Sequence, residues 1–223
     1  MTSANAKRGL FITFEGPEGS GKSTQLRGLA RRLRAAGYRV HETAEPGGTA
    51  IGLQIRRVLL DHKNQELYPT AELLLMFAAR AQNVDEAILP ALARGEVVVC
   101  DRFTDSTLVY QGEARGLGSD MVYDVDRIAC RGLVPDLTIL VDIDVDTGLG
   151  RARRRNERTQ DTETRIDEQS LEFHRKVRAA YQKLAQEEGQ RIHLVNGARL
   201  ELDVATEIWA VVEAKLIESN STK

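Results

Sequence analysis

The sequence predicts an α/β fold in which a parallel five-stranded sheet is flanked by helices. Short continuous apolar runs recur along the chain, amphipathic segments of helical length separate them, and turn-rich clusters mark the boundaries. Continuous apolar runs are typical of strands covered on both faces. Strands that alternate with helices favour parallel pairing through right-handed crossovers. We expect one domain over residues 1–223, since no linker, repeat or low-complexity tract divides the chain.

The first elements follow from apolar spacing. Residues 10–14 form a short apolar and aromatic run that is typical of a buried strand. Apolar residues then recur at helical spacing over 26–33, and Gly37 ends that helix. Residues 38–43 resemble a second strand, which ends in the turn-rich segment 45–49. The polar residues 1–8 are expected to be flexible.

The remaining elements continue the alternation. Residues 51–59 have the apolar spacing of a helix, and a longer helix over 71–94 should bend or break near Pro90, where a backbone donor is missing. The apolar runs 97–100 and 137–143 are predicted strands. We further expect helices at 119–132, 145–158, 168–188 and 201–217, and a strand at 191–195.

The composition excludes several classes of protein. Lys and Arg number 31 against 33 Asp and Glu, so no overall positive charge recruits nucleic acid. No apolar stretch approaches the roughly 18 residues that cross a bilayer, and no signal-peptide core is present. Cys100 and Cys130 have no zinc spacing, and Cys100 is expected to be a buried free thiol. We expect a soluble cytoplasmic protein that binds neither nucleic acid nor membranes.

A glycine-rich octet joins the first strand to the first helix. It reads Gly16-Pro17-Glu18-Gly19-Ser20-Gly21-Lys22-Ser23 and is followed by Thr24. In this context G-x-x-x-x-G-K-S is typical of the phosphate loop of P-loop NTPases, because backbone N–H groups and the helix N-terminus face the phosphates. We expect residues 16–24 to bind ATP, with Lys22 between the β- and γ-phosphates and Ser23 as a ligand of Mg²⁺.

A second pair of polar residues follows the predicted strand at 97–100. Asp101 and Arg102 stand at its carboxyl end, the edge at which open α/β sheets bind ligands. Asp101 is expected to hold the water shell of the metal, and Arg102 to clamp a phosphate through two hydrogen bonds. The dipeptide alone is weak support for a site.

Four segments together resemble the thymidylate kinase family in order and spacing. They read EGPEGSGKST at 15–24, EPGGT at 45–49, FAARAQ at 77–82 and DRFTDSTLVYQG at 101–112. The resemblance covers roughly residues 10–215 and is much more specific than the phosphate loop alone. It implies transfer of a phosphoryl group from ATP to dTMP, giving dTDP, with Mg²⁺, in an enzyme that forms a homodimer.

The resemblance also implies roles for individual residues. Phe77 would stack on thymine and Arg80 would hydrogen-bond to the base. The pocket for the sugar and base would be lined by Ser106, Tyr110 and Gln111. An ordinary core position is the alternative for both Phe77 and Tyr110.

The acceptor phosphate would be held by two arginines. The resemblance points to Arg56, in the helix after the 45–49 turn, and to Arg102; a solvated helix face is the alternative for Arg56. Glu18 would contact the 3′-hydroxyl of the deoxyribose. No catalytic base is expected. The acceptor is a phosphate monoester that is largely dianionic at neutral pH, so its attacking oxygen carries no proton to remove.

Stabilising the transferring phosphoryl group requires positive charge beyond Lys22, Arg102 and Mg²⁺. We expect a lid at about 151–167 to supply it. Relatives without a basic residue after the acid of the phosphate loop take that charge from a lid, and here Gly19 follows Glu18. Helical spacing puts four arginines, at 151, 154, 155 and 158, on one face, whereas the resemblance favours 151, 153 and 155. Both arguments select Arg151 and Arg155 as catalytic. A solvated basic helix is the alternative.

Two features limit the lid assignment. Relatives often carry Asp-Arg before an apolar residue and an acid, where this chain has Thr164-Arg165-Ile166-Asp167, and the stretch before Thr164 is long. If neither Arg151 nor Arg155 is the catalytic cation, Arg165 is the next candidate. A Gly19→Arg substitution is expected to replace lid charge if the geometry of the loop permits a side chain.

Two other functions remain open at this stage. One is a kinase for another nucleoside or nucleotide; the other is a nucleotide-dependent switch or assembly ATPase, which would leave the segments 77–80 and 101–111 unexplained. The turn Asn196-Gly197 is a candidate for contact with adenine. The helix at 71–94 suits either a dimer interface or burial in the core.

Overall fold

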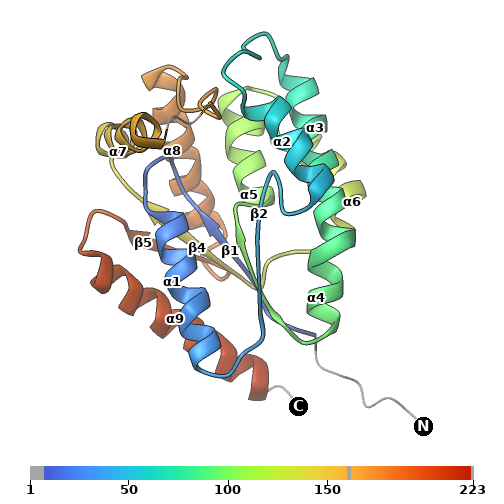
Figure 1. Cartoon of the computed structure of the whole chain (residues 1–223), viewed down its shortest axis with the longest axis vertical. Helices are drawn as coiled ribbons and strands as arrows, with labels where there is room; N and C mark the ends of the chain where they lie inside the picture. The colour runs from blue at the N-terminus through green and yellow to red at the C-terminus, as the bar shows by residue number, and fades with distance from the viewer. Residues whose placement is uncertain (1–7, 160–161, 222–223) are drawn as a thin grey trace.

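Five parallel strands form one sheet in the order β2-β3-β1-β4-β5 (Figure 1). The structure, a computed structural model, describes residues 8–159 and 162–221. The strands are β1 (Phe11–Glu15), β2 (Val40–Ala44), β3 (Val97–Asp101), β4 (Leu137–Asp142) and β5 (Ile192–Asn196). The predicted parallel five-stranded sheet is confirmed. Since β1 lies at its centre, the loop after β1 emerges between the loops after β3 and β4.

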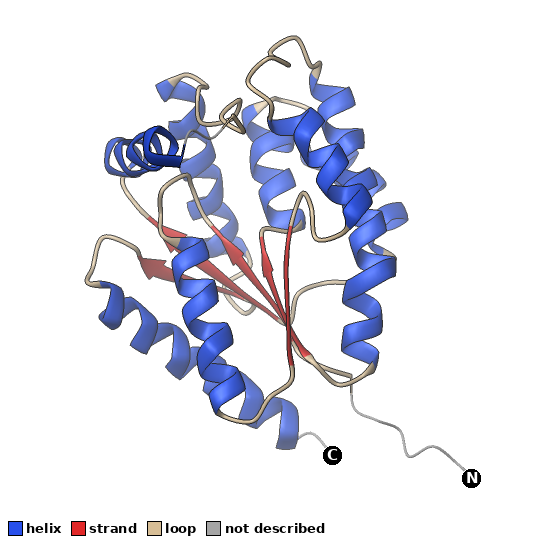
Figure 2. Ribbon diagram, viewed as in Figure 1, coloured by secondary structure: helices blue, strands red, loops and turns tan. Residues whose placement is uncertain are grey.

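Helices α1 (Lys22–Ala35) and α9 (Glu201–Ser221) cover one face of the sheet (Figure 2). Leu33 from α1 and Ile208 from α9 belong to the same apolar cluster as Ile12 and Phe14 of β1. The apolar stripe predicted over 26–33 is the buried side of α1. Burial of such side chains is worth about 1.5–3 kcal/mol each, and it fixes α1 directly behind the phosphate loop.

The other face of the sheet is covered by α3 (Pro69–Asn83), α6 (Ser119–Cys130) and α8 (Leu171–Glu187). Leu73 and Val122 join Phe11 in one apolar cluster, and Val177 joins Leu140 in another. Alternate residues of β1 therefore face opposite helical layers. The sheet is buried on both sides, as the continuous apolar runs predicted.

The long helix predicted over 71–94 forms as three consecutive helical segments. After α3 come a π-helical turn, η1 (Val84–Ile88), and the short helix α4 (Leu89–Ala93), which contains Pro90. Val84 and Ile88 are buried in the core. The helix α2 (Ala50–Leu60) precedes this unit and packs against α3.

A helix that the sequence did not predict follows β3. It consists of α5 (Thr104–Thr107) and the π-helical segment η2 (Leu108–Ala114). Residues 105–112 are all buried. A helix that is buried all round has no polar stripe, so periodicity does not reveal it. This helix carries the side chains of the 101–112 segment beneath the site.

The predicted lid begins with the second half of α7 (Val145–Thr159). Residues 162–170 then cross over the end of α2, where the Thr162 carbonyl accepts a hydrogen bond from His62 N and the Leu60 carbonyl accepts one from Arg165 N. Residues 160–161 of the lid, like 1–7 at the N-terminus, lie outside the described part. Arg8, which was expected to be flexible, forms an ion pair with Asp136.

Both cysteines are buried free thiols, as expected for Cys100. Burial raises the pKa of the Cys100 thiol well above its ordinary value. Of the helices within residues 8–159 and 162–221, none is long and apolar enough to span a membrane.

Candidate active site

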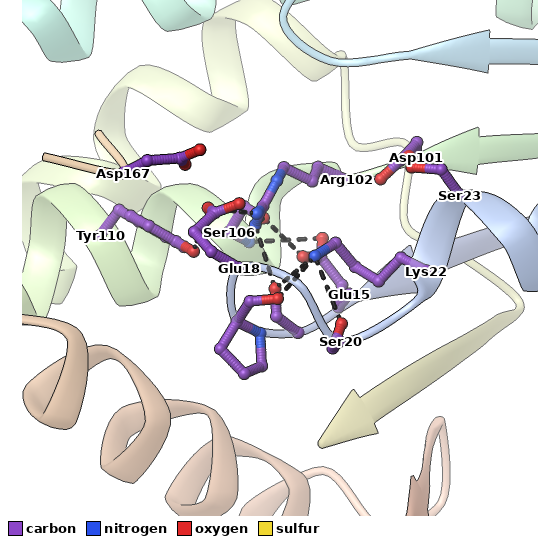
Figure 3. Close-up of polar contacts among 12 residues, drawn as sticks. Glu15, Glu18, Ser20, Lys22, Ser23, Asp101, Arg102, Ser106, Tyr110 and Asp167 are labelled. Atoms are coloured by element: carbon purple, nitrogen blue, oxygen red, sulfur yellow. Dashed lines mark hydrogen bonds and ion pairs between the residues drawn. The ribbon is translucent and has the colours of Figure 1, made fainter. Parts of the chain in front are cut away.

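The phosphate loop lies between the end of β1 and the start of α1, with Lys22 folded across it (Figure 3). Lys22 Nζ donates to the Gly16 carbonyl at 2.9 Å and the Pro17 carbonyl at 2.8 Å. Burial and the neighbouring Arg102 lower the pKa of Lys22 to about 8. The ammonium group is thus held inside the loop by backbone oxygens that phosphate oxygens would replace.

Gly19 has no room for a side chain. Its φ is +67°, and a Cβ atom would lie 1.9 Å from the backbone oxygen of Gly148 in α7. The expectation that Gly19→Arg could restore charge to the loop is therefore wrong. The close backbone approach of α7 both excludes a cation at position 19 and brings the arginines of α7 toward the loop.

Ser23 and Asp101 are in direct contact at the metal side of the loop. Ser23 Oγ donates to Asp101 Oδ2 at 2.5 Å, joining α1 to the end of β3. Within the described residues no group of three or more His, Cys, Asp or Glu could hold a metal ion. A hydroxyl and one carboxylate nevertheless fit Mg²⁺, which prefers oxygen ligands and keeps several waters and phosphate oxygens.

Glu18 and Arg102 form an ion pair of 2.6 Å across the loop (Figure 3). Tyr110 OH donates to the same Glu18 oxygen at 2.9 Å. Burial opposes ionisation of Glu18, but Arg102 and Lys22 outweigh it and lower the pKa of this carboxyl. Arg102 itself has a φ of 68°, a left-handed conformation that is uncommon outside glycine and frequent at functional sites.

A buried polar cluster under Arg102 was not predicted from the sequence. Glu15 Oε2 accepts from Ser106 Oγ at 2.5 Å and from Tyr181 OH at 2.9 Å, while Arg102 Nη1 donates to both hydroxyls. Burial and Asp105 raise the pKa of Glu15, although Arg102 opposes the shift. The one sequence feature that could have indicated this cluster is Glu15 itself, a carboxylate at the end of a buried strand. Tyr181 comes from α8, far along the chain.

One cavity of about 390 Å³ opens beside the loop on the acceptor side. Seven of the eight predicted substrate residues line it, namely Glu18, Arg56, Arg80, Arg102, Ser106, Tyr110 and Gln111. Arg56 Nε pairs with Glu163 of the lid at 2.7 Å, and its Nη1 donates to the Pro46 carbonyl. Phe77 is not among the lining residues. Its side chain is 2% exposed and lies against the Arg80 guanidinium, 4.8 Å from the ring centroid.

Arg80 is a buried residue in the wall of this cavity. Its Nη2 donates to the Phe103 carbonyl and to Thr107 Oγ1, and its Nε lies 3.3 Å from Glu45. Burial outweighs Arg80 and the hydrogen bond from Asn83, and raises the pKa of Glu45 to about 7. Glu45 is thus a further residue of the site. The sequence indicated only that it belongs to the turn at 45–49.

A second cavity, of about 790 Å³, lies on the donor side of the loop. It is lined by residues 19–25, by Arg151 and Arg155 of α7 and by residues 197–201. Arg151 Nη1 donates to the Gly197 carbonyl at 3.2 Å. The turn proposed for adenine contact therefore reaches this cavity through Gly197.

Arg155 lines both cavities, together with Lys22 and Ser23. It pairs with Asp167 of the lid at 3.1 Å. Arg165 does not meet the expectation of a reserve cation, because its side chain is 1% exposed and pairs with the buried Glu72. Arg153, Arg154 and Arg158 line neither cavity.

A phosphate loop between two cavities, at the carboxyl edge of a parallel sheet, defines a P-loop phosphotransferase that acts on nucleotides. A sequence model of the family described as "Thymidylate kinase" matches residues 14–208. Thymidylate kinase from Deinococcus radiodurans is 47% identical over 208 residues, covering 93% of this chain and 98% of that protein. The protein of that name from Pelobacter propionicus is 49% identical over 191 residues, covering 85% and 87% respectively.

A solved structure agrees. The crystal structure of thymidylate kinase from Ehrlichia chaffeensis has a TM-score of 0.74 and 31% sequence identity, covering 92% of this chain and 99% of that chain. The chain belongs to the thymidylate kinase family.

Proposed function

We propose that the enzyme transfers the γ-phosphoryl group of ATP to dTMP, giving dTDP. The observation that carries the proposal is the pair of cavities that meet at Lys22, Ser23 and Arg155. Two nucleotides bound in these cavities would bring their terminal phosphates to the same three side chains. Membership of the thymidylate kinase family supports the identity of both nucleotides.

The chemical step then requires positioning and charge. ATP lies along residues 16–24, and Lys22 exchanges the carbonyls of its own loop for the β- and γ-phosphates. Arg102 and Arg56 hold the dTMP phosphate in line, while Arg155 faces the transferring group from the lid and Arg151 binds ATP on the donor side. The attacking oxygen is already ionised, so no residue need remove a proton.

Mg²⁺ would be held at Ser23, with Asp101 ordering its water ligands, and would neutralise charge on the β- and γ-phosphates when bound. The Ser23 to Asp101 contact of 2.5 Å supports this assignment. For the base, the buried end of the acceptor cavity offers Arg80 and Gln111, with Phe77 behind Arg80. Glu18 and Tyr110 lie beside the sugar.

A coupled assay with dTMP as sole acceptor tests the proposal. We expect ADP release that depends on dTMP and Mg²⁺, and much slower release with dCMP, dAMP or dGMP. A preference for another acceptor would identify a different nucleotide kinase. ADP release at the same rate without any acceptor would identify a switch or assembly ATPase and overturn the proposal.

We also propose a homodimer in the cytoplasm. The helices α3 and α6 pack side by side, and they expose the apolar side chains of Leu74, Met121 and Ile128. Exposed apolar groups that gather on neighbouring helices favour an interface between subunits. Sedimentation equilibrium of the purified chain should give twice the monomer mass of 24.8 kDa, and cell fractionation should recover the activity with soluble proteins.

A further inference from the structure

A buried carboxylate, Glu72 of α3, lies behind the base end of the acceptor cavity. We propose that Glu72 orients the side-chain amide of Gln111 so that its oxygen faces the bound base. Glu72 thereby acts as a positioning residue that makes the site select bases with an imide edge, thymine and uracil, over cytosine. This inference rests on the proposed function.

The contact that carries the inference is short and fully buried. Gln111 Nε2 donates to Glu72 Oε1 at 2.7 Å. Glu72 is 0% exposed and Gln111 is 2% exposed, so no solvent competes for either partner. Gln111 lines the acceptor cavity, whereas Glu72 does not. The amide nitrogen is therefore directed at a group behind the cavity wall.

The chemistry of Glu72 makes this orientation the only favourable one. Arg165 Nη2 lies 2.7 Å from its Oε2, and Arg115 Nη2 donates to the same oxygen at 3.3 Å. A carboxylate that is paired with two guanidinium groups accepts hydrogen bonds and donates none. A flipped Gln111 amide would set two acceptors against each other in a buried site, at the cost of an unmade hydrogen bond.

With its nitrogen held by Glu72, Gln111 presents Oε1 to the cavity. Among the hydrogen bonds between described residues, none reaches this oxygen. Arg80 also lines this cavity, and its Nη1 is buried and has no hydrogen-bond partner within residues 8–159 and 162–221. The base end of the cavity thus offers one acceptor, from Gln111, and one donor, from Arg80.

Thymine and uracil match this pair, and cytosine does not. Their imide edge carries a donor at N3 and a carbonyl acceptor at C4, whereas cytosine has an acceptor at N3 and an amino donor at C4. Cytosine in the same place would leave buried groups unpaired on both sides. The polarity of one amide, set by Glu72, therefore separates the two classes of base.

The test is the acceptor preference of a Glu72→Gln variant of the full chain. A glutamine at position 72 can donate as well as accept, so the Gln111 amide can then take either orientation. We expect the ratio of kcat/KM for dTMP to that for dCMP to fall about tenfold or more. The ratio for dUMP to dCMP should fall in parallel, mainly through KM, because the base lies away from the reacting phosphate.

A merely structural role for Glu72 predicts a different result. It would lower kcat/KM for all three acceptors by a common factor and leave both ratios within threefold of the parent, which would overturn the proposal. Arg115→Met is the matched control: it removes one partner of Glu72 without touching Gln111, and its ratios should equal those of the parent. If Arg115→Met changed these ratios as much as Glu72→Gln does, the proposal would also be overturned.

A second variant decides the matter if Glu72→Gln has no cooperative thermal unfolding transition. Glu72→Gln combined with Gln111→Glu keeps one carboxylate in the pair and returns an acceptor to the cavity. We expect its dTMP to dCMP ratio to lie within threefold of the parent; a tenfold loss would contradict the proposal. If the parent itself has no preference for dTMP, the proposed function fails first.

Discussion

Arg102 Nη2 and Glu18 Oε1 lie 2.6 Å apart, in an ion pair that joins the phosphate loop to the end of β3. Two of the other arginines assigned to phosphate are paired in the same way, Arg56 with Glu163 and Arg155 with Asp167. These three arginines are thus each held beside the cavities by a carboxylate. Incoming phosphates would exchange with these partners, so the arginines need not be desolvated anew when substrate binds.

Lys22→Ala is predicted to remove nearly all turnover while the protein stays folded. The folded pKa of Lys22, about 8, lies below the ordinary 10.5 because burial disfavours the charged form. Loss of the ammonium group therefore relieves a cost to the folded state at neutral pH. Circular dichroism should be unchanged, as it should for the exposed control Lys176→Ala, which keeps its turnover. A rate within tenfold of the parent, about 1.4 kcal/mol of barrier, would be too small for the assigned role.

The sequence predicted those parts of the site that depend on a local backbone pattern. The phosphate loop and Asp101-Arg102 follow buried strands, so their place at the sheet edge follows from the fold. Glu72 and Tyr181 could not be found in this way, because their partners lie 39 residues or more away along the chain. Arg165 was misjudged for the same reason: its sequence neighbourhood is basic and polar, but its side chain is buried against Glu72.

Glu45 predicts a pH-dependent stability. Burial raises its folded pKa from 4.5 to about 7, so its contribution to the free energy of unfolding is greatest below pH 4.5 and is lost as the pH rises through 7. Glu45→Gln removes this dependence. Between pH 5 and 8, urea unfolding should show the parent losing stability relative to the variant, by up to about 3 kcal/mol. Parallel pH profiles would contradict the assignment.

Phe77 requires a pair of variants, because it is both buried and beside Arg80. Phe77→Leu keeps most of the apolar volume and removes the ring, so stability should fall by less than about 1.5 kcal/mol. If the ring stacks on thymine, dTMP binding should weaken by about 1–3 kcal/mol with ATP affinity unchanged. Phe77→Ala should additionally cost about 3–5 kcal/mol of stability. Undiminished dTMP affinity in Phe77→Leu would assign Phe77 to the core alone.

The arginines of α7 lead to a prediction about the rate of phosphoryl transfer. Because Gly19 cannot carry a side chain, the second cation of the transfer step must come from outside the loop, and Arg155 is the α7 arginine that reaches both cavities. If Arg155 meets charge only as the γ-phosphoryl group moves, Arg155→Met should lower kcat and kcat/KM together. A loss above about a hundredfold is expected, since an arginine finger contributes on the order of 10³–10⁵ in rate.

Arg151 lines the donor cavity alone, so Arg151→Met should raise the KM for ATP more than it lowers kcat. Arg154→Met and Arg158→Met are matched controls from the same helix: both residues are exposed, line neither cavity and should keep parental kinetics. Steady-state rates measured over a range of ATP concentrations at saturating dTMP separate these cases. If Arg155→Met, Arg151→Met and the double variant all retain a near-parental kcat, the basic half of α7 is a solvated helix face. Lys22 and Arg102, without an arginine from α7, would then stabilise the charge on the transferring group.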